Sequence, residues 1–270
     1  MEDGTVVRHK NAAATSQTAL KTTTVASRHM RVAVISDIHA NEQALGVVLE
    51  EIDSWAPDAI WCLGDVVGYG PEPNRCCELV SDRADLCLIG NHDLVALGTL
   101  DVDDFNEEAA AAALWTRSQL DERSRTFLSS LEPSAAVDGA ELFHASPRDP
   151  VWEYVLSAEA AYFSLLTTKA PLVLVGHSHV ALAIGLDDAE LHGGLAPAAT
   201  EVELDGRWLL NPGSVGQPRD GDPRAAWLEL DTEERFARFR RVAYPIEQTQ
   251  AQMRDRGLPE PLAARLALGI

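Results

Sequence analysis

Side chains that bind metal ions gather in five short motifs of this chain. In sequence order the motifs are Asp37-Ile38-His39, Gly64-Asp65, Gly90-Asn91-His92-Asp93, His144 and Gly176-His177-Ser178-His179. Carboxylates combined with imidazoles suit Zn, Fe, Mn or Ni, whereas Ca²⁺ takes oxygen ligands almost exclusively. Two such cations about 3.5–4 Å apart can hold a bridging hydroxide and clamp a phosphoryl group during in-line attack. The motifs therefore predict a two-metal site that cleaves phosphoesters.

Each motif directly follows an apolar segment with the pattern of a β-strand. The segments are 32–36, 60–63, 86–89, 141–144 and 172–175, and only the fourth ends on its own candidate, His144. In open α/β sheets, ligands bind at the carboxyl ends of strands, because loops from neighbouring strands meet there. We therefore expect five loops to bring their polar groups to one place. Asp65, in a tight turn, is the best candidate for the anionic group that bridges two cations.

The elements that must position these loops alternate between strand and helix from Arg31 onward. The order is a strand at 32–36, a helix capped by Asn41, a strand at 59–63, a helix at 74–80 and a strand at 85–89. This βαβαβ order predicts a parallel sheet with right-handed crossovers. Helices are expected at 106–120, 121–131 and 157–167 and after Pro245 and Pro261, with short strands near 141–145, 172–175, 181–184, 201–204, 207–210, 225–230 and 236–242.

We expect residues 30–270 to form one α/β domain in which two sheets pack together with helices outside both. Residues 1–29 are polar and without periodicity, which predicts a disordered leader and leaves open a start at Met1 or Met30. No apolar run reaches the roughly 20 residues of a membrane span, and no signal peptide is recognisable. The four cysteines form no C-x-x-C pair, so we expect reduced thiols and a cytoplasmic protein.

The formal net charge of −20 restricts the class of partner. Proteins that bind long nucleic acids gain most of their affinity from Lys and Arg, so an acidic chain repels such polyanions. A small phosphorylated substrate, including a nucleotide, still fits a local basic pocket. We therefore expect a small-molecule partner, with no long nucleic acid and no membrane. The oligomeric state stays open.

The five motifs, in this order, resemble those of the calcineurin-like metallophosphoesterases over 31–242. The resemblance implies a four-layer α-β-β-α sandwich, the metallophosphoesterase fold, with two mixed β-sheets flanked by helices. It also implies two divalent metal ions (Mn, Fe, Zn or Ni). One ion would take Asp37, His39, Asp65 and His179, and the other Asp65, Asn91, His144 and His177.

The same resemblance assigns catalytic roles to His92 and Asp93. His92 would not be a ligand; it would protonate the leaving oxygen or steady charge on the phosphoryl group, with Asp93 behind it. A protonatable imidazole beside a metal ligand agrees with what cleavage of an ester with a poor leaving group requires.

Three loops next to the motifs offer candidate substrate contacts. Arg148 and Arg219 can bind a phosphate bidentately, while Tyr69, Trp152 or Tyr154 can stack on a base or aryl group. Alternatively, the arginines pair with nearby acids and the rings only pack.

The segment that follows Gly64 distinguishes branches of the family. Gly64-Asp-Val-Val-Gly-Tyr-Gly70 lacks the arginine of the protein serine/threonine phosphatases, which resemble Gly-Asp-x-Val-Asp-Arg-Gly. We therefore favour a phosphodiesterase or small-molecule phosphatase. The alternatives are a phosphomonoesterase or protein phosphatase using the same site, or a non-catalytic scaffold, which the intact ligand set and His92 disfavour.

Overall fold

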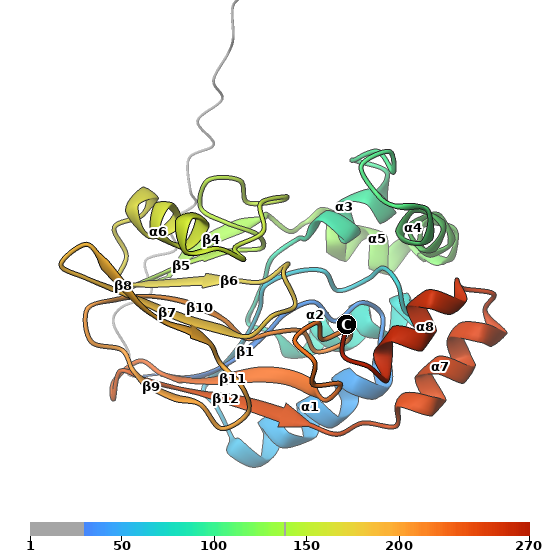
Figure 1. The fold of residues 1–270 in the computed structure, drawn as a ribbon. Helices are drawn as coiled ribbons and strands as arrows, with labels where there is room; N and C mark the ends of the chain where they lie inside the picture. The colour runs from blue at the N-terminus through green and yellow to red at the C-terminus, as the bar shows by residue number, and fades with distance from the viewer. Residues whose placement is uncertain (1–29, 138) are drawn as a thin grey trace, which may run out of the picture.

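Two six-stranded sheets pack against each other in the computed structural model, which describes residues 30–137 and 139–270 (Figure 1). The predicted leader, residues 1–29, lies outside the described residues. In Figure 1 one sheet lies above the other, with α6 outside the upper sheet and α1 outside the lower. This arrangement confirms the predicted four-layer α/β architecture.

The first sheet contains the βαβαβ unit that the sequence predicted. Its strand order is β3-β2-β1-β11-β12-β9, with β1, β2 and β3 parallel and the other pairs antiparallel. The bounds are β1 Arg31–Ile35, α1 Glu42–Trp55, β2 Ala59–Cys62, α2 Pro73–Arg83, β3 Leu86–Cys87, β9 Glu201–Glu203, β11 Ala225–Asp231 and β12 Phe236–Val242. As expected, Asn41 caps α1, where its side chain accepts a hydrogen bond from Ala44 N at 3.2 Å.

The second sheet has the order β4-β5-β6-β10-β7-β8, in which β5, β6 and β10 are parallel. Its bounds are β4 Ser134–Val137, β5 Ala140–Phe143, β6 Leu172–Val175, β7 Leu182–Asp187, β8 Glu190–Leu195 and β10 Arg207–Asn211. Helix α6, Ala158–Thr167, covers the outer face by packing Ala161 and Leu165 against residues such as Val173 and Val175.

The core lies between the sheets, and strand β1 shows how the sequence builds it. Val32 and Val34 face the second sheet, where Leu174 and Leu210 meet them, while Ala33 and Ile35 face helices α1 and α2. Successive strand residues point to opposite faces, so a strand covered on both sides is continuously apolar. The two layers of helices therefore require the unbroken hydrophobic run that precedes the first motif.

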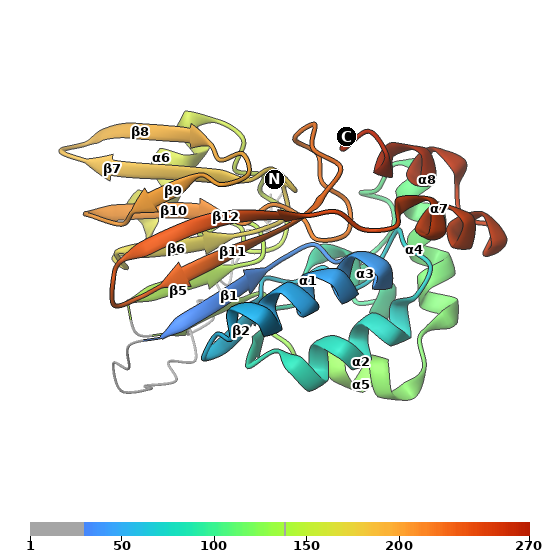
Figure 2. The same ribbon diagram turned by 90° about the horizontal axis from the view of Figure 1, so that it is seen from below.

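The remaining helices gather at one end of the sheets (Figure 2). They are α3 Asn91–Leu97, α4 Glu107–Gln119, α5 Glu122–Ser129, α7 Ile246–Asp255 and α8 Glu260–Leu266. Helix α8 begins one residue before Pro261, because proline is tolerated in the first turn of a helix. No helix in 30–137 or 139–270 combines the length and hydropathy that a membrane crossing needs.

Three elements were missed by the sequence analysis: α3, β4 and β8. Helix α3 has seven residues and begins with the polar Asn91, His92 and Asp93, which hide its periodicity. Strand β8 contains Gly193 and Gly194 at the exposed edge of its sheet, a composition that predicts a turn.

Candidate metal centre

The predicted ligands lie together where the loops after the strands converge. All seven are buried, and six of them form two overlapping groups in which one potential ligand atom per residue lies within 4.8 Å of the others. The first group is Asp37, His39, Asp65 and His179, and the second is Asp65, His144 and His177. The seventh residue, Asn91, places Oδ1 3.2 Å from His144 Nε2. The groups are those implied by the family resemblance.

Asp65 stands between the two groups. Its Oδ1 accepts a hydrogen bond from His92 N at 2.9 Å, whereas its buried Oδ2 has no hydrogen-bond partner. This Oδ2 lies 3.7 Å from His39 Nε2 and 3.6 Å from His144 Nε2. A buried carboxylate oxygen without a partner is costly unless a cation neutralises it. The free oxygen therefore fits a position shared by two cations.

The rings of His39 and His179 are oriented by backbone carbonyls. His39 Nδ1 lies 3.2 Å from Val67 O and His179 Nδ1 lies 2.6 Å from Gln217 O, so each Nδ1 carries the proton and donates it. Both Nε2 lone pairs are then free, and these two nitrogens lie 2.9 Å apart. Two lone pairs at this distance repel each other unless a cation accepts both. Carbonyl bonds of this kind are usual behind metal-binding histidines.

His144 and His177 are oriented in the same way but present different ring nitrogens. His144 Nδ1 donates to Leu63 O at 2.9 Å, which leaves Nε2 for an ion. His177 Nε2 donates to Trp152 O at 3.2 Å, which leaves Nδ1. The donor set of the second group is therefore a carboxylate oxygen, two imidazole nitrogens and an amide oxygen, which fits a borderline divalent metal.

Left-handed backbone conformations hold the ligand loops in place. Positive φ angles occur at six predicted site residues: Asp37 (53°), His39 (49°), Asp65 (52°), Tyr69 (55°), His177 (62°) and His179 (58°). The conformation costs about 1–2 kcal/mol per residue and persists only where surrounding contacts enforce it. Here His39 N donates to Asp65 O at 2.9 Å, and His177 N donates to the Asp37 carboxylate at 3.1 Å. Hydrogen bonds between the loops therefore stabilise the strained conformation of each loop.

Burial shifts the pKa values of the carboxyl and imidazole groups of the site in the directions that favour their neutral forms. It raises the pKa of Asp37 to about 7 and that of Asp65 well above its usual range. It lowers the pKa of His177 to about 2, and the pKa values of His39 and His179 fall well below their usual range for the same reason. Neutral imidazoles and carboxylates freed of their protons are the forms that bind metals. The donor chemistry therefore fits divalent cations.

His92 lies beside the first group but contributes no atom to it. Its ring centre is 4.9 Å from that of His39, 4.2 Å from Tyr69 and 4.5 Å from Phe105, and its Nδ1 is buried without a hydrogen-bond partner. Burial lowers the pKa of His92 well below its usual range, which favours the neutral ring. A neutral imidazole still has one N–H to donate. The neutral ring of His92 is therefore better suited to stabilise charge on the phosphoryl group through a hydrogen bond than to act as an acid that is protonated before the substrate binds.

The Asp93 carboxylate accepts hydrogen bonds from backbone amides. Its Oδ1 accepts from Val67 N at 2.9 Å and its Oδ2 from Gly90 N at 3.0 Å, with no hydrogen bond to the His92 ring. Asp93 thus ties the loop after β2 to the start of α3. It positions His92 through the backbone rather than by contact with the imidazole.

Of the predicted substrate contacts, Tyr69 and Arg219 lie beside the centre. Arg219 Nη2 donates to Tyr69 Oη at 3.3 Å, and the Tyr69 ring lies 4.7 Å from that of His39. Arg148 instead pairs with Glu153, with 3.0 Å between Nε and Oε2, and lies over the Phe163 ring. That pairing is the alternative left open for the arginines, so a substrate role for Arg148 stays a prediction.

Further aromatic rings adjoin the histidines of the centre. Tyr154 stacks on His177 with 4.0 Å between ring centres, and Trp152 meets Phe105 edge to face at 5.9 Å. Tyr154 is 47% exposed, so one face of its ring is open to a ligand.

Three residues beside the site were missed by the sequence analysis: Phe105, Gln217 and Arg265. Gln217 lies in the loop singled out around Arg219. Phe105 and Arg265 carry no signal, because a phenylalanine before a helix and an arginine on a surface helix are ordinary features.

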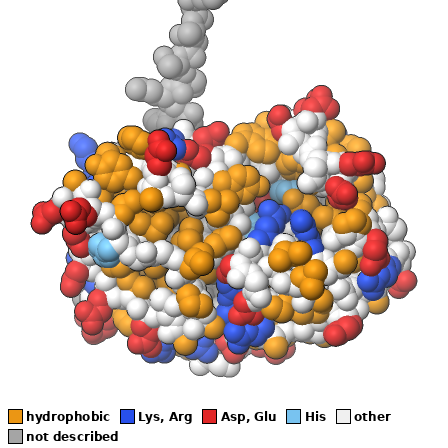
Figure 3. Space-filling model, viewed as in Figure 1, with side chains coloured by type: hydrophobic (Ala, Val, Ile, Leu, Met, Phe, Trp, Pro, Cys, Tyr) orange, Lys and Arg blue, Asp and Glu red, His pale blue; other side chains and the backbone are white. Residues whose placement is uncertain are grey.

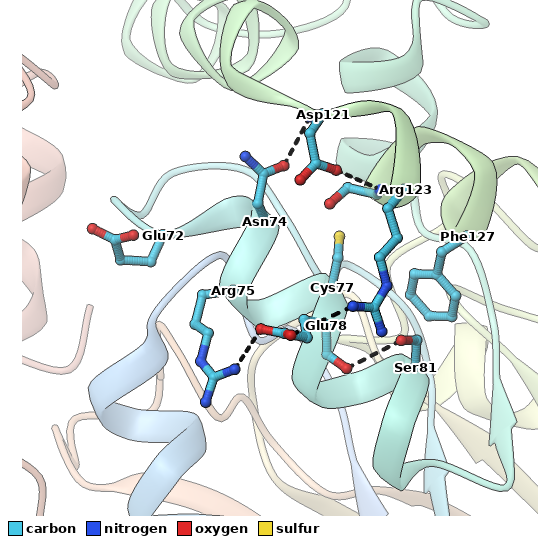
Figure 4. Close-up of a pocket in the computed structure, with 10 residues that line it drawn as sticks. Glu72, Asn74, Arg75, Cys77, Glu78, Ser81, Asp121, Arg123 and Phe127 are labelled. Atoms are coloured by element: carbon cyan, nitrogen blue, oxygen red, sulfur yellow. Dashed lines mark hydrogen bonds and ion pairs between the residues drawn. The ribbon is translucent and has the colours of Figure 1, made fainter.

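A hollow in the described residues lies away from the centre, between α2 and α5 (Figure 4). Its volume is about 300 Å³. Both arginines that line it are paired: Arg75 with Glu78, and Arg123 with Glu78 and with Asp82, which lies outside the lining. None of its lining residues is a predicted metal ligand, so it is separate from the centre.

Known proteins share this fold and sequence. An uncharacterized protein of Methanocaldococcus jannaschii is 38% identical over 243 residues, which are 88% of this chain and 98% of the relative. A metallophosphoesterase from Sphaerobacter thermophilus is 42% identical with a TM-score of 0.81, over 90% of this chain and 100% of the other. A Pyrococcus horikoshii protein, 18% identical over 89% and 98% of the two chains with a TM-score of 0.72, shares the fold. Residues 30–233 match the calcineurin-like phosphoesterase superfamily domain, and the chain therefore belongs to that superfamily.

Proposed function

We propose that this protein hydrolyses small phosphodiesters, nucleotides among them, with two divalent cations held by the residues described above. The observation that carries the proposal is the buried, unpartnered Oδ2 of Asp65, which is nearly equidistant from His39 Nε2 and His144 Nε2. Its position supports two ions sharing one carboxylate. The net charge of −20 supports a small substrate rather than a long nucleic acid.

Bound cations would supply a water deprotonated near neutral pH and would neutralise charge on the phosphoryl oxygens. The chain's own residues orient the metal-binding atoms and donate a hydrogen bond to the substrate. The carbonyl-bonded histidines keep their free nitrogens aimed at the ions, and His92 donates its N–H to the phosphoryl or leaving oxygen. The oxygen of a water molecule bonds to phosphorus as the P–O bond to the leaving group breaks, and the proton released by that water ends on the leaving oxygen.

The test is hydrolysis of bis-p-nitrophenyl phosphate and p-nitrophenyl phosphate by metal-stripped protein supplied with Mn, Ni, Zn, Fe or Mg. We expect faster cleavage of the diester. We expect Asp65→Asn to lose metal and activity, and His92→Ala to keep metal but to turn over about 10²–10⁴-fold more slowly. His192→Ala is the matched control, because His192 lies in β8 and pairs with Asp187. Equal rates in all four proteins with every metal would falsify the proposal.

A further inference from the structure

Arg219 and Arg265 differ from the other arginines of the described chain in their partners. Arg219 donates only to neutral groups, Gln217 Oε1 at 2.8 and 3.2 Å and Tyr69 Oη at 3.3 Å. For the Arg265 guanidinium, neither an ion pair nor a hydrogen bond occurs within residues 30–137 and 139–270. Elsewhere, arginines pair with carboxylates, as Arg254 does with Glu260, or donate to backbone carbonyls. In a chain of net charge −20, two unpaired guanidinium groups at one place are unexpected.

Packing brings the segments that carry the two arginines together near Tyr69. Leu262 and Leu266, which flank Arg265 on α8, belong to the same buried cluster as Tyr69. The loop of Arg219 is joined to the end of α8 by the hydrogen bond from Gly221 N to Gly269 O at 2.9 Å. Burial and then the charge of Arg219 lower the pKa of Arg265, as expected for like charges at short range.

Basic side chains also gather on the surface at this place. In Figure 3 arginine or lysine side chains cluster near the middle of the face, where Figure 1 places the C-terminus beside α8, and a histidine is visible in the hollow next to them. Most other charged groups on this face are acidic or lie at its rim. Tyr69 and then Glu108 partly offset the lowering of the pKa of Arg265, but within the described residues neither forms an ion pair or a hydrogen bond with its guanidinium.

The charge balance of a centre that holds two divalent cations indicates what the unpaired arginines can bind. Three buried carboxylates, Asp37, Asp65 and Asp93, bring three negative charges, and two divalent cations would bring four positive ones. The carboxylates are then fully offset by the ions, and neither guanidinium has a counter-charge left in the site. A half-buried arginine pair of this kind is suited to bind a phosphate bidentately.

We propose that Arg219 and Arg265 form a second anion subsite beside the metal centre, which binds a phosphoryl group next to the one that is cleaved. The substrate class is therefore diphosphate esters, in which two phosphoryl groups share an oxygen. This inference rests on the proposed function and deepens it. Arg265 lies beyond residue 233, where the match to the superfamily domain ends, so α8 adds this recognition to the shared centre.

The test compares two non-hydrolysable ligands, methylenediphosphonate and methylphosphonate, by calorimetric titration of the metal-loaded protein. Arg265→Ala should weaken binding of the diphosphonate about 10- to 100-fold, the range for a lost hydrogen bond to a charged group. Binding of methylphosphonate should change less than twofold. Arg265→Lys should restore part of the affinity, since it keeps the charge but not the bidentate geometry. Arg254→Ala, on α7 and paired with Glu260, is the matched control and should match wild type.

Arg265→Gln replaces Arg265→Ala if the alanine variant is unfolded by circular dichroism. Equal weakening of both phosphonates, or of neither, would overturn the proposal. Hydrolysis separates this result from failure of the proposed function. A protein that cleaves no phosphoester with any metal refutes the proposed function, whereas one that cleaves monophosphate and diphosphate diesters equally well before and after Arg265→Ala refutes only the subsite.

Discussion

Gly90 is the residue whose replacement most directly tests the role of Asp65. A Cβ atom at position 90 would collide with Asp65 Oδ1 and lie 2.6 Å from Asp65 N, far inside ordinary contact distance. These are backbone and buried carboxylate atoms that cannot move aside freely. Gly90→Ala must therefore displace the Asp65 carboxylate or the start of α3, although it removes no proposed ligand.

The magnitude follows from the contact that the displacement breaks. Asp65 Oδ1 accepts a hydrogen bond from His92 N at 2.9 Å. A hydrogen bond to a charged group contributes about 1.5–3 kcal/mol. Loss of a contact that orients a metal ligand lowers metal affinity about 10- to 100-fold, which agrees with that range. We therefore expect metal affinity to fall by this factor and turnover at subsaturating metal to fall with it.

The assay is competition for Mn²⁺ or Zn²⁺ against a chelator, with thermal unfolding measured in parallel. Gly46→Ala is the matched control, because Gly46 lies within α1 and a Cβ there meets nothing within 4 Å. It should stabilise the protein by about 0.5–1 kcal/mol and leave metal affinity unchanged. Wild-type metal affinity in a folded Gly90→Ala protein would refute the placement of Asp65 as the shared ligand.

Three further predictions concern pH, a helix cap and the core. Burial raises the pKa of Asp37 to about 7 and that of Asp65 well above its usual range, so protons compete with the cations, and metal affinity measured by titration should rise by at least about tenfold per pH unit up to pH 7. Asn41→Ala removes the cap of α1 and the bond to Gly216 O at 2.9 Å, and should lower the free energy of unfolding in urea by about 1–3 kcal/mol. Leu174→Ala, between the sheets, should lower it by about 2–5 kcal/mol.

The sequence predicted most of the fold because burial on both sides of a strand leaves a plain signal. The runs that became β1, β2 and β6 are uniformly apolar and end at polar motifs. The sequence did not predict strand β8 or helix α3, because the glycines of β8 and the polar residues at the start of α3 hide the strand and helix patterns. In β8 the sequence His192-Gly193-Gly194 is typical of a turn, yet it lies in a strand, where His192 Nε2 is 2.8 Å from Asp187 Oδ2.

The sequence predicted which residues gather at the candidate site, but not the contacts that position them. Order and residue type identified the residues that gather at the candidate metal centre, because few other arrangements bring carboxylate and imidazole to successive strand ends. The bonds of Asp93 to Val67 N and Gly90 N depend on how two loops pack, which no local pattern encodes. The partner of Arg148 illustrates the same limit, because Glu153 lies only five residues away and takes its guanidinium.

The positive φ angles of five predicted ligands explain why the geometry of the centre depends on the whole fold. Asp and His tolerate a positive φ better than β-branched residues do, so the ligand types suit the conformation as well as the metal. Each of the five strained ligands still costs about 1–2 kcal/mol, and each is held by loops that end on different strands. No single loop can therefore adopt the binding geometry alone. The ligand positions become fixed only when both sheets are packed, which makes metal affinity a property of the whole α-β-β-α core.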